Sequence, residues 1–514
     1  MPDILLRDVS KGELKFEARE GETLLSAFGR AGIPVSAPCG GKHRCGKCKV
    51  KILQGRVRDI FTDENNVNSE GAAALPKDTV LACRSIPETP VTAALVLEDS
   101  YEEGAYDRIS SSGEDFGRIS RAAVALDVGT TTVSACLIDL DTGREAASYS
   151  ALNQQRVFGA DVMSRISAAR EGKTGELFEI IKRQTRELIS GFLEKSGLSS
   201  IETLVVAANT TMLHLFANED PSAMGEIPFT PVFLEGREYS GKDLSLPAEK
   251  VMLLPSISAF IGGDIVSGLM LLNILESNET VFFIDIGTNG EMALFHEGKL
   301  YCASAAAGPA LEGAEISCGV GSIRGAVNKV EWKDGCLSWN VIGGDDAYGL
   351  PAGNPVGICG CGLIDAVAVI LDQGIIDETG AFSDDCKDFQ IAPGVSLNGR
   401  DIRQFQLAKS AILSAIKIVF RKAGLELSEV KKVYAAGGLG FYIDQRAAVR
   451  TGLFPKEFLG RIEVCGNASL KGAIKALLSP DFAEYCKRIK DAAVTIDIAS
   501  DPAFMDEFAE NMLF

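Results

Sequence analysis

The chain has 514 residues, of which 46% are hydrophobic and 24% are charged, so it is long enough for three or four globular domains. Its formal net charge of -19 argues against nonspecific nucleic-acid binding, which requires a basic surface. Residues 1–60 nevertheless hold 12 Lys and Arg against 7 Asp and Glu, a net charge of +5, and the remaining residues carry a net charge of -24. This asymmetry is explained either by chance or by a basic docking face for an acidic partner.

No segment has the pattern of a secretory signal or of a membrane span. Residues 1–16 alternate polar and apolar side chains like a strand and lack an apolar h-region. The most apolar stretch, Val251–Leu275, is interrupted by Pro255 and Asp264. The 13 cysteines in a chain without a signal favour metal binding in a reducing compartment over a disulfide framework. We therefore expect a cytoplasmic protein with neither a membrane nor a nucleic acid as partner.

Residues 1–97 are predicted to form a small α+β domain. Residues 3–18 have the alternation of a β-hairpin, with its turn at Lys11-Gly12. A short amphipathic helix is expected at Thr23–Ala31. Three further strands are predicted at Cys48–Leu53, Thr79–Ala82 and Val91–Leu97.

Four cysteines of this first domain have the spacing of an iron–sulfur site. Cys39, Cys45 and Cys48 form the pattern C-x5-C-x2-C, and Cys83 follows after 34 intervening residues. A cluster needs four converging thiolates, of which one tight loop can supply three. The pattern has one residue more in its first gap than the plant-type pattern, and the segment resembles a ferredoxin that carries one [2Fe–2S] cluster. A tetrahedral zinc site and unligated thiols are the alternatives.

Residues 98–121 are acidic and rich in Ser and Gly, which is typical of a linker, although an acidic loop within one domain has the same composition. An α/β pattern with an internal repeat follows. The strand Ala122–Asp127 leads into Gly129-Thr130-Thr131-Thr132, and the strand Val281–Asp285 leads into Gly287-Thr288-Asn289-Gly290. The two aspartates are 158 residues apart, which indicates a duplicated domain. We expect subdomains at 122–275 and 276–480, followed by a helical tail at 481–514.

The two repeated loops have the chemistry of a phosphate site. A carboxylate at the end of a strand can hold Mg²⁺ directly or through water, and a glycine lets phosphate approach backbone N–H groups. A strand in Val433–Gly440 is predicted to deliver Gly437-Gly438 to a helix start, where a nucleotide base or ribose could lie on the backbone. Gly262-Gly263-Asp264 and Gly466-Asn467-Ala468 are each predicted to open a helix.

These elements resemble the nucleotide site of the ASKHA superfamily, with its actin-like, duplicated ribonuclease-H-like α/β fold. The alternative is that the loops are ordinary tight turns in an unrelated α/β fold. The resemblance implies that Asp264 orients the attacking water as a general base. It also implies ATP and Mg²⁺ as ligands, held by Asp127, Gly129, Thr130, Thr131, Asp285, Gly287, Thr288, Asn289, Gly437 and Gly438.

The combination of the two halves resembles the reductive activators of corrinoid enzymes over nearly the whole chain. The segments that carry the resemblance are PCGGKHRCGKC, ALDVGTTT, ANTTMLHLF, IDIGTNGE, AGPALEGAEISCG and GICGCGLIDA. The family passes one electron from the cluster to Co(II) of a corrinoid protein and restores Co(I) for methyl transfer. It implies a corrinoid protein and an upstream electron donor as partners, and a homodimer is possible. Ala208 and Cys361 depart from the residues expected there.

Two alternative functions were weighed. ATP-driven activators of 2-hydroxyacyl-CoA dehydratases resemble ASKHA domains, but they hold a [4Fe–4S] cluster at a dimer interface and have no ferredoxin domain. A redox-sensing, ATP-binding regulatory protein is the second alternative. Cys359 and Cys361 allow a second cluster or a redox pair, and Glu312 and Glu315 either line the nucleotide cleft or face the partner; the pattern does not decide these points.

Overall fold

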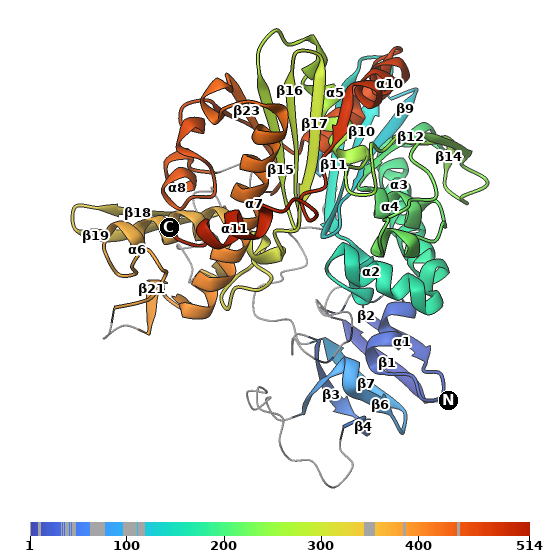
Figure 1. The fold of residues 1–514 in the computed structure, drawn as a ribbon. Coiled ribbons are helices and arrows are strands. Elements are labelled where there is room, and N and C mark those ends of the chain that lie inside the picture. The colour runs from blue at the N-terminus through green and yellow to red at the C-terminus, as the bar shows by residue number, and fades with distance from the viewer. Residues whose placement is uncertain are drawn as a thin grey trace.

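The computed structural model describes the chain except for residues 1, 9–11, 32, 34, 36–40, 42, 44–47, 62–77, 96–109, 112–118, 344–354, 384–386 and 439–442. A small N-terminal domain (blue in Figure 1) is followed by two larger α/β subdomains that lie side by side. Within the described ranges, every helix is too short or too polar to span a bilayer.

The N-terminal domain is a five-stranded sheet covered by one helix, as predicted. Its strand order is β2-β1-β7-β3-β5, in which β1 and β7 are parallel and the other pairs are antiparallel. Ile4, Leu6, Phe28 and Val50 form its core. The elements are β1 (Asp3–Asp8), β2 (Gly12–Glu17), α1 (Leu24–Arg30), β3 (Lys49–Gln54), β4 (Val57–Asp59), β5 (Thr79–Leu81), the 3-10 turn η1 (Ala82–Arg84), β6 (Ser85–Pro87) and β7 (Val91–Leu95).

The first α/β subdomain is built on a seven-stranded sheet of order β13-β14-β12-β9-β10-β11-β8. Strand β8 (Ser110–Ser111) lies within the predicted linker and pairs with β11, so part of that segment belongs to this sheet. The other elements are β9 (Ala122–Val128), β10 (Thr132–Asp139), β11 (Arg144–Leu152), η2 (Gln154–Phe158), α2 (Val162–Ala168), α3 (Thr174–Ser196), β12 (Ile201–Ala208), α4 (Thr210–Phe216), β13 (Arg237–Ser240), β14 (Ala248–Leu253) and α5 (Gly263–Leu271).

The second subdomain has a six-stranded sheet of order β24-β23-β15-β16-β17-β25 and smaller sheets beside it. Its strands are β15 (Val281–Ile286), β16 (Gly290–His296), β17 (Lys299–Ala305), β18 (Ala326–Lys333), β19 (Cys336–Val341), β20 (Gly357–Ile358), β21 (Asp388–Ala392), β22 (Val395–Asn398), β23 (Lys432–Ala436), β24 (Ile462–Gly466) and β25 (Ala493–Thr495). Its helices are η6 (Pro309–Glu312), α6 (Gly360–Asp372), α7 (Gly399–Ala423), α8 (Gln445–Arg450), α9 (Ala468–Leu478), α10 (Phe482–Ala492) and α11 (Phe504–Glu510).

The predicted duplication is confirmed by the topology of the two sheets. The order β14-β12-β9-β10-β11 in the first sheet corresponds to β24-β23-β15-β16-β17 in the second. In both sheets the first three strands are parallel and the next two pairings are antiparallel. The turns β9–β10 and β15–β16, which contain the two repeated loops, therefore occupy equivalent places.

Helices α5 and α9 join the two sheets. Both helices begin where the glycine-containing motifs predicted, and Asn467 caps α9 by accepting the Leu470 N–H at 2.8 Å. Ser267 of α5 donates to the Ser469 carbonyl of α9 at 2.6 Å. The hydrophobic cluster around these helices takes residues from both sheets, so the subdomains share one core.

The C-terminal segment differs from the helical tail predicted at 481–514. Helices α10 and α11 are present, but β25 lies between them and pairs in parallel with β17. The backbone N–H of Ile496 also donates to the Cys302 carbonyl at 2.8 Å. The segment thus completes the second sheet instead of extending from it.

Asp365 of α6 is a buried carboxylate outside both predicted sites. It is 3% exposed, and its Oδ2 accepts the Val330 N–H at 3.2 Å and lies 3.7 Å from Lys329 Nζ. Its Oδ1 has no hydrogen-bond partner among the described residues. Burial raises the pKa of Asp365 to about 7, although Lys329 opposes the shift.

The raised pKa of Asp365 predicts a pH-dependent stability. The folded chain keeps the proton that the unfolded chain loses near pH 4, so the stabilisation is complete below that pH and is lost as the pH rises to about 7. Asp365→Asn should therefore raise the free energy of unfolding by roughly 1–2 kcal/mol more at pH 8 than at pH 5.5. Urea unfolding at the two pH values measures this, and an equal effect at both would contradict it.

Candidate functional site

Two of the four predicted cluster cysteines lie within the described residues, and the fold brings them together. Cys48 immediately precedes β3 and Cys83 lies in η1; both are buried, and their sulfurs are 3.2 Å apart. The hydrogen bond to Cys83 lowers the pKa of the Cys48 thiol to about 7. Two converging thiols, of which Cys48 has a lowered pKa, suit an iron–sulfur cluster. Cys39 and Cys45 lie outside the described residues.

His43 contacts this pair of cysteines and is itself held by a chain of side chains. Its Nδ1 lies 3.3 Å from Cys83 Sγ, and its ring packs edge-to-face on Phe61 with ring centroids 5.0 Å apart. The guanidinium of Arg84 lies over the same Phe61 ring at 4.9 Å and pairs with Asp59 at 3.1 Å. Burial, with a smaller contribution from Arg84, lowers the pKa of His43, which favours a neutral ring with one N–H donor.

The cysteine pair also faces the first α/β subdomain. A cavity of about 320 Å³ lies between the two bodies, lined on one side by Leu25, His43 and Cys83 and on the other by Val157 and Ser164. Figure 1 shows α2 directly above the N-terminal domain. The predicted electron carrier is therefore close to the subdomain that contains the first repeated loop.

Hydrogen bonds from several other elements hold the first loop, between β9 and β10, in place. Asp127 accepts hydrogen bonds from Asn467 Nδ2 and Ser469 Oγ, both at 2.8 Å, so residues of the second subdomain orient a carboxylate of the first. Asn209, which caps α4, donates to Thr130 Oγ1 at 3.0 Å. The buried Arg165 of α2 donates to the Thr130 carbonyl. Thr130 is thus held through both its backbone and its side chain.

The second loop, between β15 and β16, lies beside the glycine pair predicted for the nucleotide base or ribose. Asp285 is the next-to-last residue of β15, and a Cβ at Gly437 would lie 2.6 Å from Asp285 Oδ1. Gly437 also has φ +92°, so both space and backbone conformation require glycine there. Gly438 follows it, whereas residues 439–442 are not described. Asn289 donates to Glu291 Oε1 at 3.1 Å, which draws a further carboxylate into the loop.

Five carboxylates gather where the two loops face each other, and each has a raised pKa. Burial is the main cause in every case, and repulsion between the carboxylates adds to it for three of them. The pKa of Asp264 is raised to about 7 and that of Asp285 to about 8. Asp264 lies in the first turn of α5, and its Oδ1 accepts the Ile265 N–H at 2.8 Å. Such a cleft favours a bound cation, which would return these groups to their charged forms.

Glu291 is a site residue that the sequence motifs did not identify, and Glu312 is one of the two glutamates between which the sequence did not decide. Glu291 is 9% exposed in β16, and a charged residue inside the apolar run GEMALF was the available signal. Glu312 lies in the cleft, where its Oε2 accepts from Thr131 Oγ1 at 3.0 Å and from Thr288 Oγ1 at 2.7 Å. Glu315, three residues further on, is exposed.

The remaining candidate residues, Cys359 and Cys361, lie in a hydrophobic core. Cys359 caps α6 and Cys361 lies in its first turn, both buried in the core of the second subdomain. Burial raises the pKa of the Cys359 thiol. No group of three or more His, Cys, Asp or Glu side chains among the described residues is arranged to hold a metal ion. The described part of the chain therefore gives no support for a second cluster at Cys359 and Cys361.

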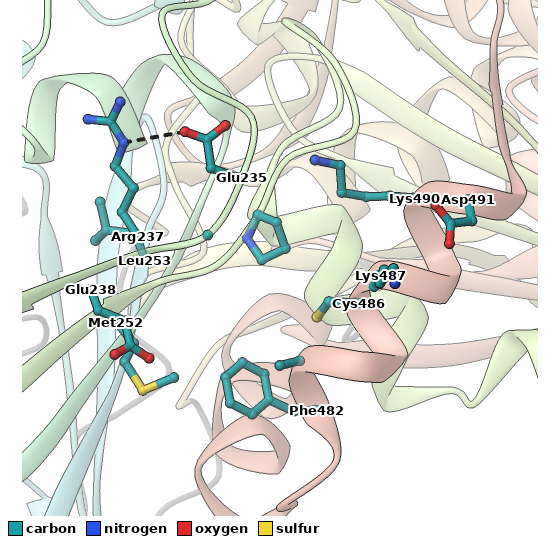
Figure 2. Close-up of a pocket in the computed structure, with 13 residues that line it drawn as sticks. Glu235, Arg237, Glu238, Met252, Leu253, Phe482, Cys486, Lys487, Lys490 and Asp491 are labelled. Atoms are coloured by element: carbon teal, nitrogen blue, oxygen red, sulfur yellow. Dashed lines mark ion pairs between the residues drawn. The ribbon is translucent and has the colours of Figure 1, made fainter.

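A cavity of about 430 Å³ lies between the edge strand β13, its neighbour β14 and helix α10. Figure 2 shows Arg237 beside Glu235 on one wall and Lys490 with Asp491 on the other. None of the residues predicted for the cluster or nucleotide site lines this cavity. Its size alone assigns it no role.

Family models match three consecutive parts of the chain. Residues 8–88 match the 2Fe-2S iron-sulfur cluster binding domain, and residues 122–277 match the RACo middle region. Residues 279–514 match the C-terminal domain of RACo, the ASKHA domain. The two RACo models together cover well over half of the chain, and their boundary falls between α5 and β15.

Similar proteins agree with these matches. The corrinoid activation enzyme RamQ of Eubacterium limosum is 29% identical over 570 residues, covering 94% of this chain and 94% of RamQ. The [Co(II) methylated amine-specific corrinoid protein] reductase of Methanosarcina barkeri is 28% identical and covers 71% of this chain and 72% of its own. A solved structure titled reductive activator for corrinoid, iron-sulfur protein superposes with a TM-score of 0.70 at 25% identity, covering 100% of this chain and 98% of the other. The chain therefore belongs to the family of reductive activators of corrinoid proteins, with a [2Fe–2S]-binding domain followed by an ASKHA domain.

Proposed function

We propose that this protein is an ATP-dependent reductase that passes one electron from its [2Fe–2S] cluster to Co(II) of a corrinoid protein and regenerates Co(I). The observation that carries the proposal is the presence, in one chain, of converging cysteine thiols and two facing Asp-Gly-Thr loops. The relatives named as corrinoid activation enzyme and corrinoid protein reductase support the same substrate class.

The energetics of electron transfer explain why such a chain needs both a cluster domain and a nucleotide-binding domain. A plant-type [2Fe–2S] cluster has a potential near about -400 mV. Each 100 mV by which the acceptor is harder to reduce costs about 2.3 kcal/mol per electron. Coupling between two sites of a protein is typically about 1–3 kcal/mol, so nucleotide-linked changes are on the scale needed to favour a difficult transfer. An upstream electron donor must then reduce the cluster again after each electron transfer.

In this proposal the residues of the cleft have separate tasks. The carboxylates Asp127 and Asp285 hold Mg²⁺, directly or through water, and the Thr130, Thr131 and Thr288 hydroxyls donate to phosphate oxygens. Backbone N–H groups at Gly129 and Asn289 supply further donors, and Gly437 and Gly438 line the place for the nucleoside. The N–H of Gly287 already donates to the Asn289 carbonyl at 2.9 Å, so Gly287 contributes the space that a side chain would fill. Asp264, in the first turn of α5 beside the two loops, is the proposed general base. A homodimer is proposed as well, with the molecular mass in solution as its test.

Replacing one carboxylate between the two loops should impair ATP-dependent reduction of cobalt while leaving the iron–sulfur cluster unaffected. Asp127→Asn keeps the shape of the side chain but removes the charge that Asn467 and Ser469 orient. We expect ATP-dependent formation of Co(I) to fall by at least about 100-fold, because charge neutralisation and positioning dominate phosphate chemistry. The electron paramagnetic resonance spectrum of the reduced cluster should be unchanged.

The matched control is Asp141→Asn, which makes the same charge change at an exposed turn of the same subdomain. This variant should form Co(I) at the rate of the unsubstituted protein. Co(I) formation that survives in Asp127→Asn would remove Asp127 from the site, and an altered cluster spectrum would show that the substitution acts through the fold.

The contact between His43 and Cys83 predicts an effect on the cluster potential. An N–H donor to a ligand sulfur stabilises the more negative, reduced cluster and raises its potential. His43→Asn tolerates the φ of +60° at this position, but its shorter side chain should not reach Cys83. The midpoint potential should fall by roughly 50 mV, since about 59 mV corresponds to a tenfold change for one electron and one hydrogen bond to a charged acceptor has this scale.

A redox titration followed by electron paramagnetic resonance measures this shift. His296→Asn is the control, because His296 pairs with Thr280 in the second subdomain, away from the cysteines. Both variants should retain two irons and two sulfides per chain. An unchanged midpoint potential in His43→Asn would mean that the His43 ring does not donate to the cluster.

A further inference from the structure

Glu312 makes a connection between the two phosphate loops that no motif indicated. One oxygen, Oε2, accepts the Thr131 hydroxyl of the first loop and the Thr288 hydroxyl of the second loop. Thr131 belongs to the first subdomain, whereas Thr288 and Glu312 belong to the second. The hydrogen bond between Thr131 and Glu312 therefore crosses the cleft.

A tight turn and hydrogen bonds to α7 fix the backbone that carries Glu312. Glu312 is the last residue of η6, and Gly313 follows it with φ +81°. A Cβ at Gly313 would lie 2.5 Å from the Val320 carbonyl oxygen, so the chain turns back tightly on itself there. Ser317 then donates its N–H and its hydroxyl to the two carboxylate oxygens of Asp401, at 2.7 and 2.6 Å, in the first turn of α7. The position of Glu312 thus depends on α7 rather than on a loose loop.

The two threonine hydroxyls are the donors that the loops would offer to phosphate. Each hydroxyl has one proton to donate, and in the structure both protons are directed to the same carboxylate oxygen. A phosphate oxygen is an anionic acceptor of the same kind, and two anions that compete for the same donors repel each other. The carboxylate and a phosphate group therefore cannot use these hydroxyls at the same time.

We propose that Glu312 is a positioning residue that takes the place of a phosphate group between the two loops whenever no nucleotide is bound. It holds Thr131 and Thr288 with their hydroxyls directed to one point, and it releases them when a nucleotide phosphate arrives. This inference rests on the proposed function, because it requires that the cleft binds a nucleotide. When the phosphate enters, the direct link from Thr131 to Glu312 is exchanged for one through the nucleotide, while the link from Asp127 to Asn467 and Ser469 can remain.

The test compares Glu312→Gln with Glu315→Gln, a matched variant in the same segment whose side chain is exposed. Binding of ADP to the full-length protein with its cluster is measured by calorimetry, once with Mg²⁺ and once with EDTA. Glu312→Gln should bind ADP about tenfold more tightly than the unsubstituted protein, because a charge that repels the phosphate is gone. The gain should be larger in EDTA, where no Mg²⁺ screens the two anions. Glu315→Gln should bind like the unsubstituted protein.

Hydrogen exchange supplies a second readout that does not require a nucleotide. Peptides that contain residues 129–132 and 287–290 should exchange faster in nucleotide-free Glu312→Gln than in the unsubstituted protein, because a neutral amide oxygen accepts the two hydroxyls more weakly than a carboxylate oxygen does. With saturating ADP and Mg²⁺ the two proteins should exchange alike. If the Gln variant folds poorly, Glu312→Ala removes the same charge and should show the same direction of change in both measurements.

The outcomes separate this inference from the proposed function. Weaker binding of ADP by Glu312→Gln in Mg²⁺, with no change in EDTA, would make Glu312 a group that holds the metal and overturn its role as a stand-in for phosphate. Equal affinity and equal exchange in both proteins would also overturn it. If the unsubstituted protein and Glu315→Gln bind no ADP at all, the nucleotide part of the proposed function fails, and unchanged loop exchange in Glu312→Gln would then reject the positioning role separately.

Discussion

The packing of α5 against α9 is the constraint on which the arrangement of the ASKHA domain depends. Each helix follows a strand of one sheet, and together they join both sheets into one hydrophobic core. The Ser267 hydroxyl donates to the Ser469 carbonyl and so links the middle of α5 to the beginning of α9. Because Asp264 opens α5 and Asn467 precedes α9, the same packing brings polar groups of both subdomains to the mouth of the cleft. A change in the angle between these helices would move both phosphate loops at once.

Charge is the second organising feature of the cleft. Five carboxylates share a poorly solvated space, and the protein compensates with hydroxyl and amide donors rather than with lysine or arginine. Asn467 and Ser469 donate to Asp127, and Thr131 and Thr288 donate to Glu312. Neutral donors orient the carboxylates without cancelling their charge, which leaves the cleft attractive to a metal ion. The raised pKa values follow from the same arrangement, since each group is ionised only at a cost until a cation is present.

Helix α2 lies between the first repeated loop and the [2Fe–2S]-binding domain. Arg165 on one side of it donates to the Thr130 carbonyl of the first phosphate loop. Ser164 and Ala168 of the same helix line the cavity that also contains His43 and Cys83. Burial lowers the pKa of Arg165 to about 9, and the hydrogen bonds of its guanidinium end on carbonyl, amide and thioether acceptors rather than on a carboxylate. A single short helix thus contacts the loop of one site and the surroundings of the other.

Much of this protein was predictable from local sequence patterns. Alternating and apolar runs located the strands, the repeat around Asp127 and Asp285 predicted the duplicated sheets, and the cysteine spacing predicted the [2Fe–2S]-binding domain, because each of these signals lies within a few consecutive residues. Contacts between distant segments were not predictable in this way. The choice of Glu312 over Glu315, the donation from Asn467 to Asp127 and the approach of His43 to Cys83 each join residues dozens to hundreds of positions apart. Only the packing of the subdomains decides such contacts, since a short stretch of sequence contains no information about which remote side chain will face it.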